Sequence, residues 1–374
     1  MGITKKHNLD VNSRTLAFYA WFAVFLAVSL FSQRTNAELF DDLICPDSEI
    51  RQKAFYRLDS SNQTIQEKVI VRLIERSYNS SNQQDDLALK ALKAMRASAI
   101  GPAIKTIDDI TLAEKNPWVA ICLNAGKEAV PELRKFLGSD EIHAVSAAGL
   151  MLLVDPEMKE ASAFLSKKLK TSKSDKLALF CLKALSLESE PSDTDLQNVI
   201  TRLEKPGNLR EAALACLDKF GARASPSVPE VLKVLETESK EGMILPLKVL
   251  GNCGESAYEA VPYLCELAAK DDIVLRLNVL RVIGEIGVDP ARSLPVLEVS
   301  LKHEDEFVIA AAADALGRFD KKAYRSVPAL SKALMSCKQN YTQDKIIQAL
   351  RVIGTEDALA AVDKFRKEIR QKKK

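Results

Sequence analysis

The chain has 374 residues, of which 47% are hydrophobic, 6% aromatic and 28% charged, and it carries 53 Lys and Arg against 51 Asp and Glu. This composition excludes a collagen, a small disulfide-rich domain, a disordered charged chain and a polytopic membrane protein. Only three histidines are present. A His-rich metal site, or an acid–base site built on histidine, is therefore not expected.

The N-terminus has the features of an export signal. An apolar run without charges spans residues 16–31, follows three basic residues and is succeeded by a short polar stretch that ends at Ala37. This order is typical of a secretory signal peptide. As a helix the run would measure about 24 Å, less than the roughly 30 Å of a hydrocarbon core. We expect residues 1–37 to be a cleaved signal and the protein to be periplasmic or secreted. The alternative is a membrane anchor formed by residues 16–31.

The charge of the remaining chain is unevenly distributed. Without residues 1–37 it has 49 bases and 50 acids, and residues 363–374 alone carry seven bases and two acids. Residues 38–362 therefore have a net charge of −6. A nucleic-acid-binding surface needs a basic stripe, so no nucleic-acid partner is expected. The basic C-terminal end is either a patch for anionic lipid or an acidic partner, or a solvated helix end.

A repeat of 33 residues runs through the chain. Pro229, Pro262, Pro295 and Pro328 follow one another at this spacing, and each stands after an aliphatic residue and before an apolar helical segment. Proline suits the first turn of a helix, where its missing N–H would have no partner in any case. We therefore predict that each of these prolines opens the first helix of a helix pair.

A second helix is predicted to precede each proline. Gly251, Gly284 and Gly317 stand eleven residues before three of the prolines and close an apolar segment. A fourth copy, LRVIG, ends at Gly354 after a turn that is four residues longer. Since glycine favours the left-handed conformation at helix ends, we predict that the second helices end at these glycines.

Weaker copies extend the pattern toward the N-terminus. Segments around Pro102 and Pro131 match the helix opening, and residues 50–58 and 65–74 are expected to form a first helix pair. We predict about ten helix pairs and an all-α fold, a right-handed α-solenoid over residues 38–370 with its clearest repeats at 209–354 and a basic tail at 371–374. Each pair would bury its apolar faces only against the next one.

These features resemble a known family. The proline-opened helices, the LRVIG segment and the acids at the turns are similar to short HEAT repeats of the type also named after phycobilisome lyases; these acids are Asp271, Asp272, Glu304 and Asp305. The resemblance is clear over residues 209–353 and weaker over 85–208. It implies a solenoid whose second helices line an inner, concave wall.

The chain lacks the residues that known enzymes built on such repeats use. Deoxyhypusine hydroxylases hold two irons with several His-Glu dipeptides, whereas this chain has one, His303-Glu304, so a di-iron site is excluded. We expect His303 to be an exposed turn residue. Bilin lyases share only the repeat pattern. The sequence has no glycine-rich phosphate loop and no nucleophile elbow. We expect no catalytic residue, no bound metal and no cofactor.

The cysteines and asparagines provide few further signals. None of the seven cysteines lies in a CxxC motif, and four of them stand among apolar residues as expected for core thiols: Cys122, Cys181, Cys216 and Cys265. Cys253 and Cys265 flank one turn and could form a disulfide in an oxidising compartment, although separate thiols are the expected state. Three glycosylation sequons begin at Asn62, Asn79 and Asn340.

The strongest candidate site is a row of charges. Lys248, Arg281, Asp314 and Arg351 stand three positions before the four closing glycines. Stacked second helices would place them about 10 Å apart on the inner wall, where a ladder of charges could bind an extended peptide or an acidic surface. Alternatively, each pairs with an acid of a neighbouring repeat or remains solvated. We expect an exported, non-enzymatic scaffold that binds another protein or peptide. The alternative is a chromophore- or substrate-handling enzyme on the same repeats.

Overall fold

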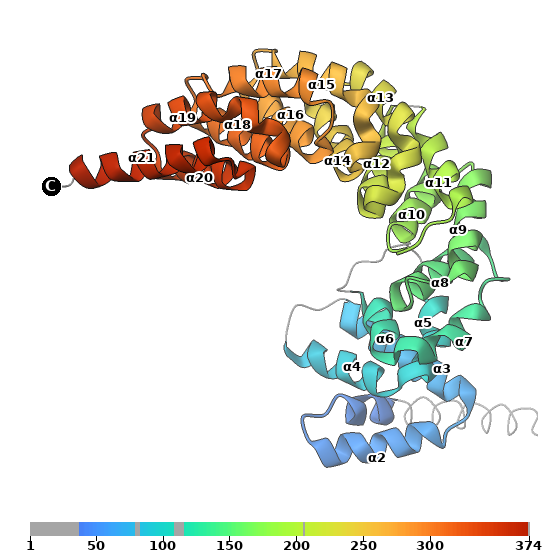
Figure 1. Cartoon of the computed structure of the whole chain (residues 1–374). Coiled ribbons are helices and arrows are strands. Elements are labelled where there is room, and N and C mark those ends of the chain that lie inside the picture. Colours follow the sequence, from blue (N-terminus) through green and yellow to red (C-terminus); the bar gives the residue numbers. More distant parts are fainter. Residues whose placement is uncertain (1–36, 79–82, 108–115, 205, 373–374) are drawn as a thin grey trace, which may run out of the picture. The chain divides into compact units, whose positions relative to one another are not determined.

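The computed structural model of the chain describes residues 37–78, 83–107, 116–204 and 206–372 (Figure 1). All regular elements in these ranges are helices, as the sequence predicts. The contacts divide the chain into two compact units, unit 1 (residues 1–155) and unit 2 (residues 156–374). None of the helices described is both long and apolar enough to traverse a bilayer. The expected signal or anchor lies outside the described residues, apart from Ala37.

Unit 1 contains a short helix at 37–43 followed by helices α2 to α8. Their bounds are α2 (Ser48–Asp59), α3 (Gln63–Tyr78), α4 (Gln83–Ala94), η1 (Arg96–Ala99), α5 (Ile100–Lys105), α6 (Pro117–Ala125), η2 (Gly126–Ala129), α7 (Val130–Arg134) and α8 (Glu141–Val154). Helix α3 packs mainly on α4 and α5, and its contact with α2 is small. The expected first pair, α2 and α3, is thus present as two consecutive helices in contact, and α3 packs more extensively on the helices that follow it.

Unit 2 contains the regular repeats. Its elements are α9 (Lys159–Thr171), α10 (Asp175–Leu185), α11 (Asp193–Ile200), η3 (Thr201–Leu203), α12 (Asn208–Phe220), η4 (Gly221–Ser227), α13 (Val228–Thr237), η5 (Glu241–Met243), α14 (Ile244–Asn252), η6 (Gly254–Ala260), α15 (Val261–Ala268), α16 (Ile273–Ile286), α17 (Pro290–Ser300), α18 (Glu306–Arg318), η7 (Asp320–Ser326), α19 (Val327–Ser336), α20 (Asn340–Ile353) and α21 (Glu356–Lys372).

The helices of unit 2 form two layers. The second helices α10, α12, α14, α16, α18 and α20 each pack on the next one in this series, and the first helices follow them on the other side. Figure 1 shows the second helices α14, α16, α18 and α20 on the inner side of the curve of this unit. Each pair contacts mainly its neighbours, so the core is a continuous line of Leu, Val, Ile and Ala side chains, as expected for a solenoid.

The repeat prolines open three of the four helices as predicted. Pro229, Pro262 and Pro328 lie in the first turn of α13, α15 and α19, each after a short 3-10 segment. Pro295 is different, because it lies inside α17. That helix begins five residues earlier, at Pro290, where the side chain of Asp289 accepts the N–H of Arg292 and caps the helix.

The repeat glycines have a different role from the one predicted. Gly251, Gly284 and Gly317 lie inside α14, α16 and α18, and none has a positive φ. The left-handed position follows three residues later, at Gly254, Gly287 and Asp320, with φ between 51° and 63°. Only in the fourth copy does the LRVIG glycine, Gly354, itself adopt the left-handed conformation, with φ 67°.

Close packing explains two of these three glycines, Gly284 and Gly317. A Cβ atom at Gly284 would lie 2.7 Å from the Cα atom of Ala315 in the next second helix, and one at Gly317 would lie 3.2 Å from the Cα atom of Ala349. These glycines allow the backbones of successive second helices to approach each other.

Candidate functional site

The predicted row of charges lies on the second helices of unit 2, and three of its four members form ion pairs. Lys248 Nζ is 2.7 Å from Asp218 Oδ2 of the preceding second helix. Arg281 Nη1 is 2.6 Å from Glu285 Oε2 within α16. These ion pairs agree with the second interpretation of the row, in which its charges pair with acidic residues of the protein itself.

Asp314 links two repeats. Its Oδ1 atom accepts a hydrogen bond from Lys345 Nζ of α20 at 2.8 Å, and its Oδ2 atom accepts one from Arg318 Nε at 3.3 Å. Partial burial raises the pKa of the Asp314 carboxyl, but the bonds and positive charges of Lys345 and Arg318 outweigh this effect and hold the pKa below its ordinary value. Asp314 is therefore ionised at neutral pH and is held between two cations.

Arg351 does not belong to the row. Helices α16, α18 and α20 each begin 14 residues before a left-handed residue, namely Gly287, Asp320 and Gly354. In this register Arg351 corresponds to Gly284, and Gln348 corresponds to Arg281. The packing agrees, since Gly284 contacts Ala315 and Gly317 contacts Ala349, the equivalent residue. The predicted place of Arg351 in the row is wrong, because the LRVIG motif occurs in two registers and the residue lies exposed one turn away.

A row of exposed apolar residues, which the sequence analysis missed, lies on the same layer. Val274, Phe307 and Tyr341 are the second residues of α16, α18 and α20, and their exposed fractions are 64%, 55% and 55%. The ring centroids of Phe307 and Tyr341 are 6.3 Å apart. We call these three residues the apolar row. Consecutive members of the row are 33 and 34 residues apart in the sequence. This spacing becomes visible when the repeats are aligned on the left-handed residues Gly287, Asp320 and Gly354.

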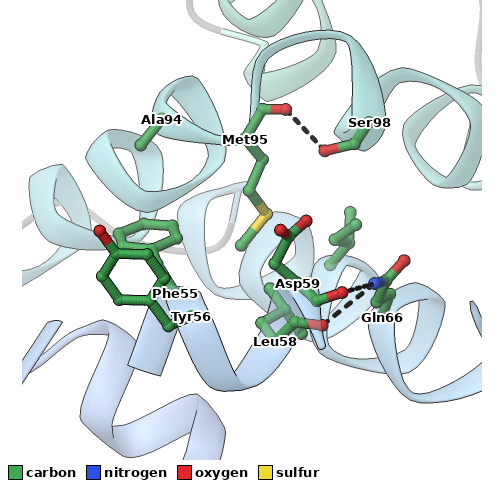
Figure 2. Close-up of a pocket in the computed structure, with 9 residues that line it drawn as sticks. Phe55, Tyr56, Leu58, Asp59, Gln66, Ala94, Met95 and Ser98 are labelled. Carbon is green, nitrogen blue, oxygen red and sulfur yellow. Dashed lines mark hydrogen bonds between the residues drawn. The ribbon is translucent and has the colours of Figure 1, made fainter. Parts of the chain in front are cut away.

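A cavity of about 300 Å³ in unit 1 lies beside the end of α2 (Figure 2). Figure 2 shows the side chains of Met95 and Asp59 directed toward the middle of this cavity, with the ring of Tyr56 at its side. The amide of Gln66 donates to the carbonyl oxygens of Leu58 at 3.0 Å and of Asp59 at 3.2 Å. Gln66 therefore provides a hydrogen-bond donor to the last carbonyl groups of α2. The residues that line this cavity do not include a nucleophile paired with a base.

The titratable residues named in the sequence analysis are dispersed. Within the described ranges no group of three His, Cys, Asp or Glu side chains is placed to hold a metal ion. Cys253 and Cys265 are separate thiols. His303 is half-buried rather than exposed, because its ring contacts Arg276, with Nε2 2.6 Å from Nη1. Asn62 and Asn340 are exposed, and Asn79 lies outside the described residues.

Comparison with known proteins identifies the repeats. The model of HEAT repeats matches residues 228–317 and 261–351, and no curated protein matches the chain. Among solved structures, the chain is similar to yeast importin-beta, Kap95p (13% identity, TM-score 0.47, 97% of this chain and 62% of that one). It is also similar to the karyopherin Kap121p bound to the extreme C-terminus of the phosphatase Cdc14p (13%, 0.47, 93% and 44%).

A third similar structure is the complex of CpcE and CpcF of phycocyanin lyase from Nostoc sp. PCC7120 (17% identity, TM-score 0.35, 64% of this chain and 93% of that one). The chain spans about half the length of the karyopherins it matches. Residues 228–351, which carry the regular prolines and glycines, are therefore HEAT repeats.

Proposed function

We propose that this protein is an interaction scaffold whose second-helix layer in unit 2 binds another protein or a peptide. The observation that carries the proposal is the apolar row. Three large apolar side chains at equivalent positions of consecutive repeats are more than half exposed. Contiguous apolar side chains on the surface of a protein typically mark a binding site, and aromatic residues contribute most to such interfaces.

The charges beside the apolar row suit the polar rim of an interface. The pairs Lys248–Asp218 and Arg281–Glu285 are partly exposed, with side-chain exposures of 53% and 37% for the two basic residues. Exposed pairs of this kind contribute at most about 1 kcal/mol each, so a partner can exchange them for its own charges at little cost. Interfaces commonly combine apolar anchors with such a rim.

Export and the absence of catalysis are parts of the same proposal. The order of basic, apolar and small residues before residue 38 supports an exported protein, either periplasmic or secreted. The net charge of −6 over residues 38–362 favours a protein partner over a nucleic acid. Association with a membrane would occur through the N-terminal segment if this segment stays uncleaved.

The proposal is tested by crosslinking from the apolar row. A photoreactive amino acid replaces Phe307, and the protein is expressed in its native host with a C-terminal tag. We expect one protein partner to be crosslinked in stoichiometric amount. Adding Val274→Ser and Tyr341→Ser should abolish this crosslink. The matched control carries the photoreactive group at Tyr258, which is equally exposed on η6.

A second variant tests the rim. Reversing Lys248 and Arg281 to Glu should weaken capture of the crosslinked partner, and reversal of Arg351, which lies outside the row, should have little effect. A crosslink of equal strength from Tyr258, or one that survives the substitutions in the apolar row, would contradict the proposal. A small molecule that co-purifies in place of a protein would favour the substrate-handling alternative.

A further inference from the structure

A cavity of about 400 Å³ lies between the first helices α15 and α17, and its lining residues are not those of the apolar row. Its walls include the apolar side chains of Ala268, Val296 and Val299, together with the thiol of Cys265. Arg276 and His303 complete the lining and provide its charged and polar groups. Val299 is 68% exposed, so this wall is open to a ligand. The volume is within the range of small-molecule sites.

Arg276 closes the end of α15. Its Nε atom donates to the carbonyl oxygen of Ala268 at 2.9 Å and its Nη2 atom to that of Lys270 at 2.8 Å. The Nη1 atom lies 2.6 Å from Nε2 of His303, a ring whose Nδ1 atom accepts the N–H of Asp305. The bonds to carbonyl oxygens use two of the five N–H groups of the guanidinium, and no carboxylate of the described chain forms an ion pair with it.

A second arginine of this protein, Arg210, occupies the equivalent position two repeats earlier and does form an ion pair. Arg210 stands 66 residues, or two repeats, before Arg276. Its Nε and Nη2 atoms donate to the carbonyl oxygens of Leu203 and Glu204 at 2.7 and 3.1 Å. Its Nη1 atom, however, binds the carboxylate of Glu238 at 2.7 Å. Arg210 thus repeats every contact of Arg276 except that a carboxylate stands where Arg276 has a histidine.

Arg276 therefore lacks the anion that Arg210 has, because the His303 ring takes the place of that carboxylate at Nη1. Glu304, which follows His303, is exposed and forms no ion pair with Arg276 among the described contacts. A guanidinium that is partly buried and lacks an anion is a strong site for a carboxylate, because charge-assisted bonds to it are short and bidentate. The adjoining walls are apolar, so a ligand that carries an alkyl chain next to its carboxylate would satisfy both parts of the cavity.

We propose that the cavity between α15 and α17 binds a small amphipathic carboxylate, of the class of free medium-chain fatty acids. The carboxylate pairs with the open N–H groups of Arg276, and the alkyl chain covers Val296 and Val299. This site is separate from the apolar row. Each methylene group that leaves water should strengthen binding about fourfold.

The test uses octanoate as the probe and the full chain in a Cys45→Ser background. Isothermal titration measures the binding of octanoate, and of octanol as the uncharged control. The rate at which iodoacetamide modifies Cys265, followed by mass spectrometry, reports occupancy of the cavity itself. We expect octanoate to bind and to slow the modification of Cys265, and octanol to bind at least about tenfold more weakly.

Two substitutions copied from other repeats separate ligand binding from folding. Arg276→Gln imitates Gln343, which stands at the equivalent position of α20 and donates to the carbonyl oxygen of Cys337 at 2.7 Å. His303→Glu imitates Glu238 and supplies the missing carboxylate from within the chain. Both variants should stay folded, as thermal unfolding will show, and both should lose octanoate binding at least about tenfold.

Lys302→Gln is the matched control, because it removes a positive charge from an exposed neighbour of His303 that does not line the cavity, and it should retain binding. The proposal would be overturned if octanoate failed to bind, if octanol bound equally well, or if either Arg276→Gln or His303→Glu bound octanoate as the unmodified chain does. Binding without any protection of Cys265 would also overturn it, because the ligand would then lie elsewhere.

Discussion

Gly284 and Gly251 stand at equivalent positions of two neighbouring repeats, yet replacing each with alanine should change stability in opposite directions. At Gly284 the new Cβ atom would lie 2.7 Å from the Cα atom and 2.9 Å from the Cβ atom of Ala315. These atoms are backbone or directly attached to it and cannot move alone. Overpacking of this kind costs about 1–3 kcal/mol, and the better helix propensity of alanine returns about 1 kcal/mol. The difference spans about 0–2 kcal/mol, and we expect a net loss of about 1 kcal/mol.

At Gly251 the contacts are with a flexible side chain. The new Cβ atom would meet the end of the Glu285 carboxylate and would lie 3.5 Å from a methyl group of Val282. Glu285 can turn away, at the cost of its pair with Arg281, which is about 0.3–0.5 kcal/mol for such a spacing. Since alanine gains about 1 kcal/mol in a helix, Gly251→Ala should be stabilising by about 0.5 kcal/mol.

Urea unfolding followed by circular dichroism measures both variants. With a slope of about 2 kcal/mol per molar urea, the midpoints of the two variants should differ by about 1 M. Amide hydrogen exchange in α16 and α18 provides a local measure of the same effect. Equal midpoints, or a Gly284→Ala variant more stable than Gly251→Ala, would show that the second helices do not approach as closely as the structure places them.

Three further predictions follow from individual residues. Asp320 has a left-handed backbone with φ 51°, so Asp320→Gly should raise the free energy of unfolding by about 0.5 kcal/mol in the same urea assay. Burial of Glu188, together with the charge of Asp195, raises the pKa of its carboxyl, so ionisation opposes folding as the pH rises above the ordinary value of 4.5. Glu188→Gln should therefore stabilise the protein at pH 7 and lose this advantage as the pH falls below 4.5; an advantage that persists at pH 3 would refute the assignment. Burial raises the pKa of Cys122 to about 12, so alkylation of the native protein should modify the half-buried Cys45 and Cys265 and leave Cys122 unmodified until urea is added.

The fold followed from the sequence because its signals are local. A proline in the first turn, an apolar stripe and an acid at a turn are properties of a few neighbouring residues. In the structure the turn acids Asp272 and Asp305 cap α16 and α18. The early start of α17 was also readable, since Asp289 and Pro290 form a cap and a first-turn proline, but the regular spacing of Pro295 masked this second signal.

The candidate site was less predictable because it depends on register and on partners in other repeats. The partners of Lys248 and Asp314 are Asp218 and Lys345, each about one repeat away, and no local pattern selects them. Arg351 was misplaced because glycine serves two purposes in this chain, close packing at one position and the left-handed conformation three residues later. A sequence motif does not distinguish the two roles. The structure does, because a close-packed glycine faces the backbone of the next second helix and a left-handed one does not.

The small residues between second helices also determine how sharply unit 2 bends. Gly251 faces Val282, whereas Gly284 and Gly317 face Ala315 and Ala349, whose Cα atoms come within contact distance. When successive helix pairs lie closer together in the layer of second helices than in the layer of first helices, the stack curves toward the second helices. The side chain that faces each glycine therefore contributes to the angle between successive pairs. A single exchange between valine and alanine there would change the curvature, and with it the span of partner that the inner surface can follow, without altering any residue that touches the partner.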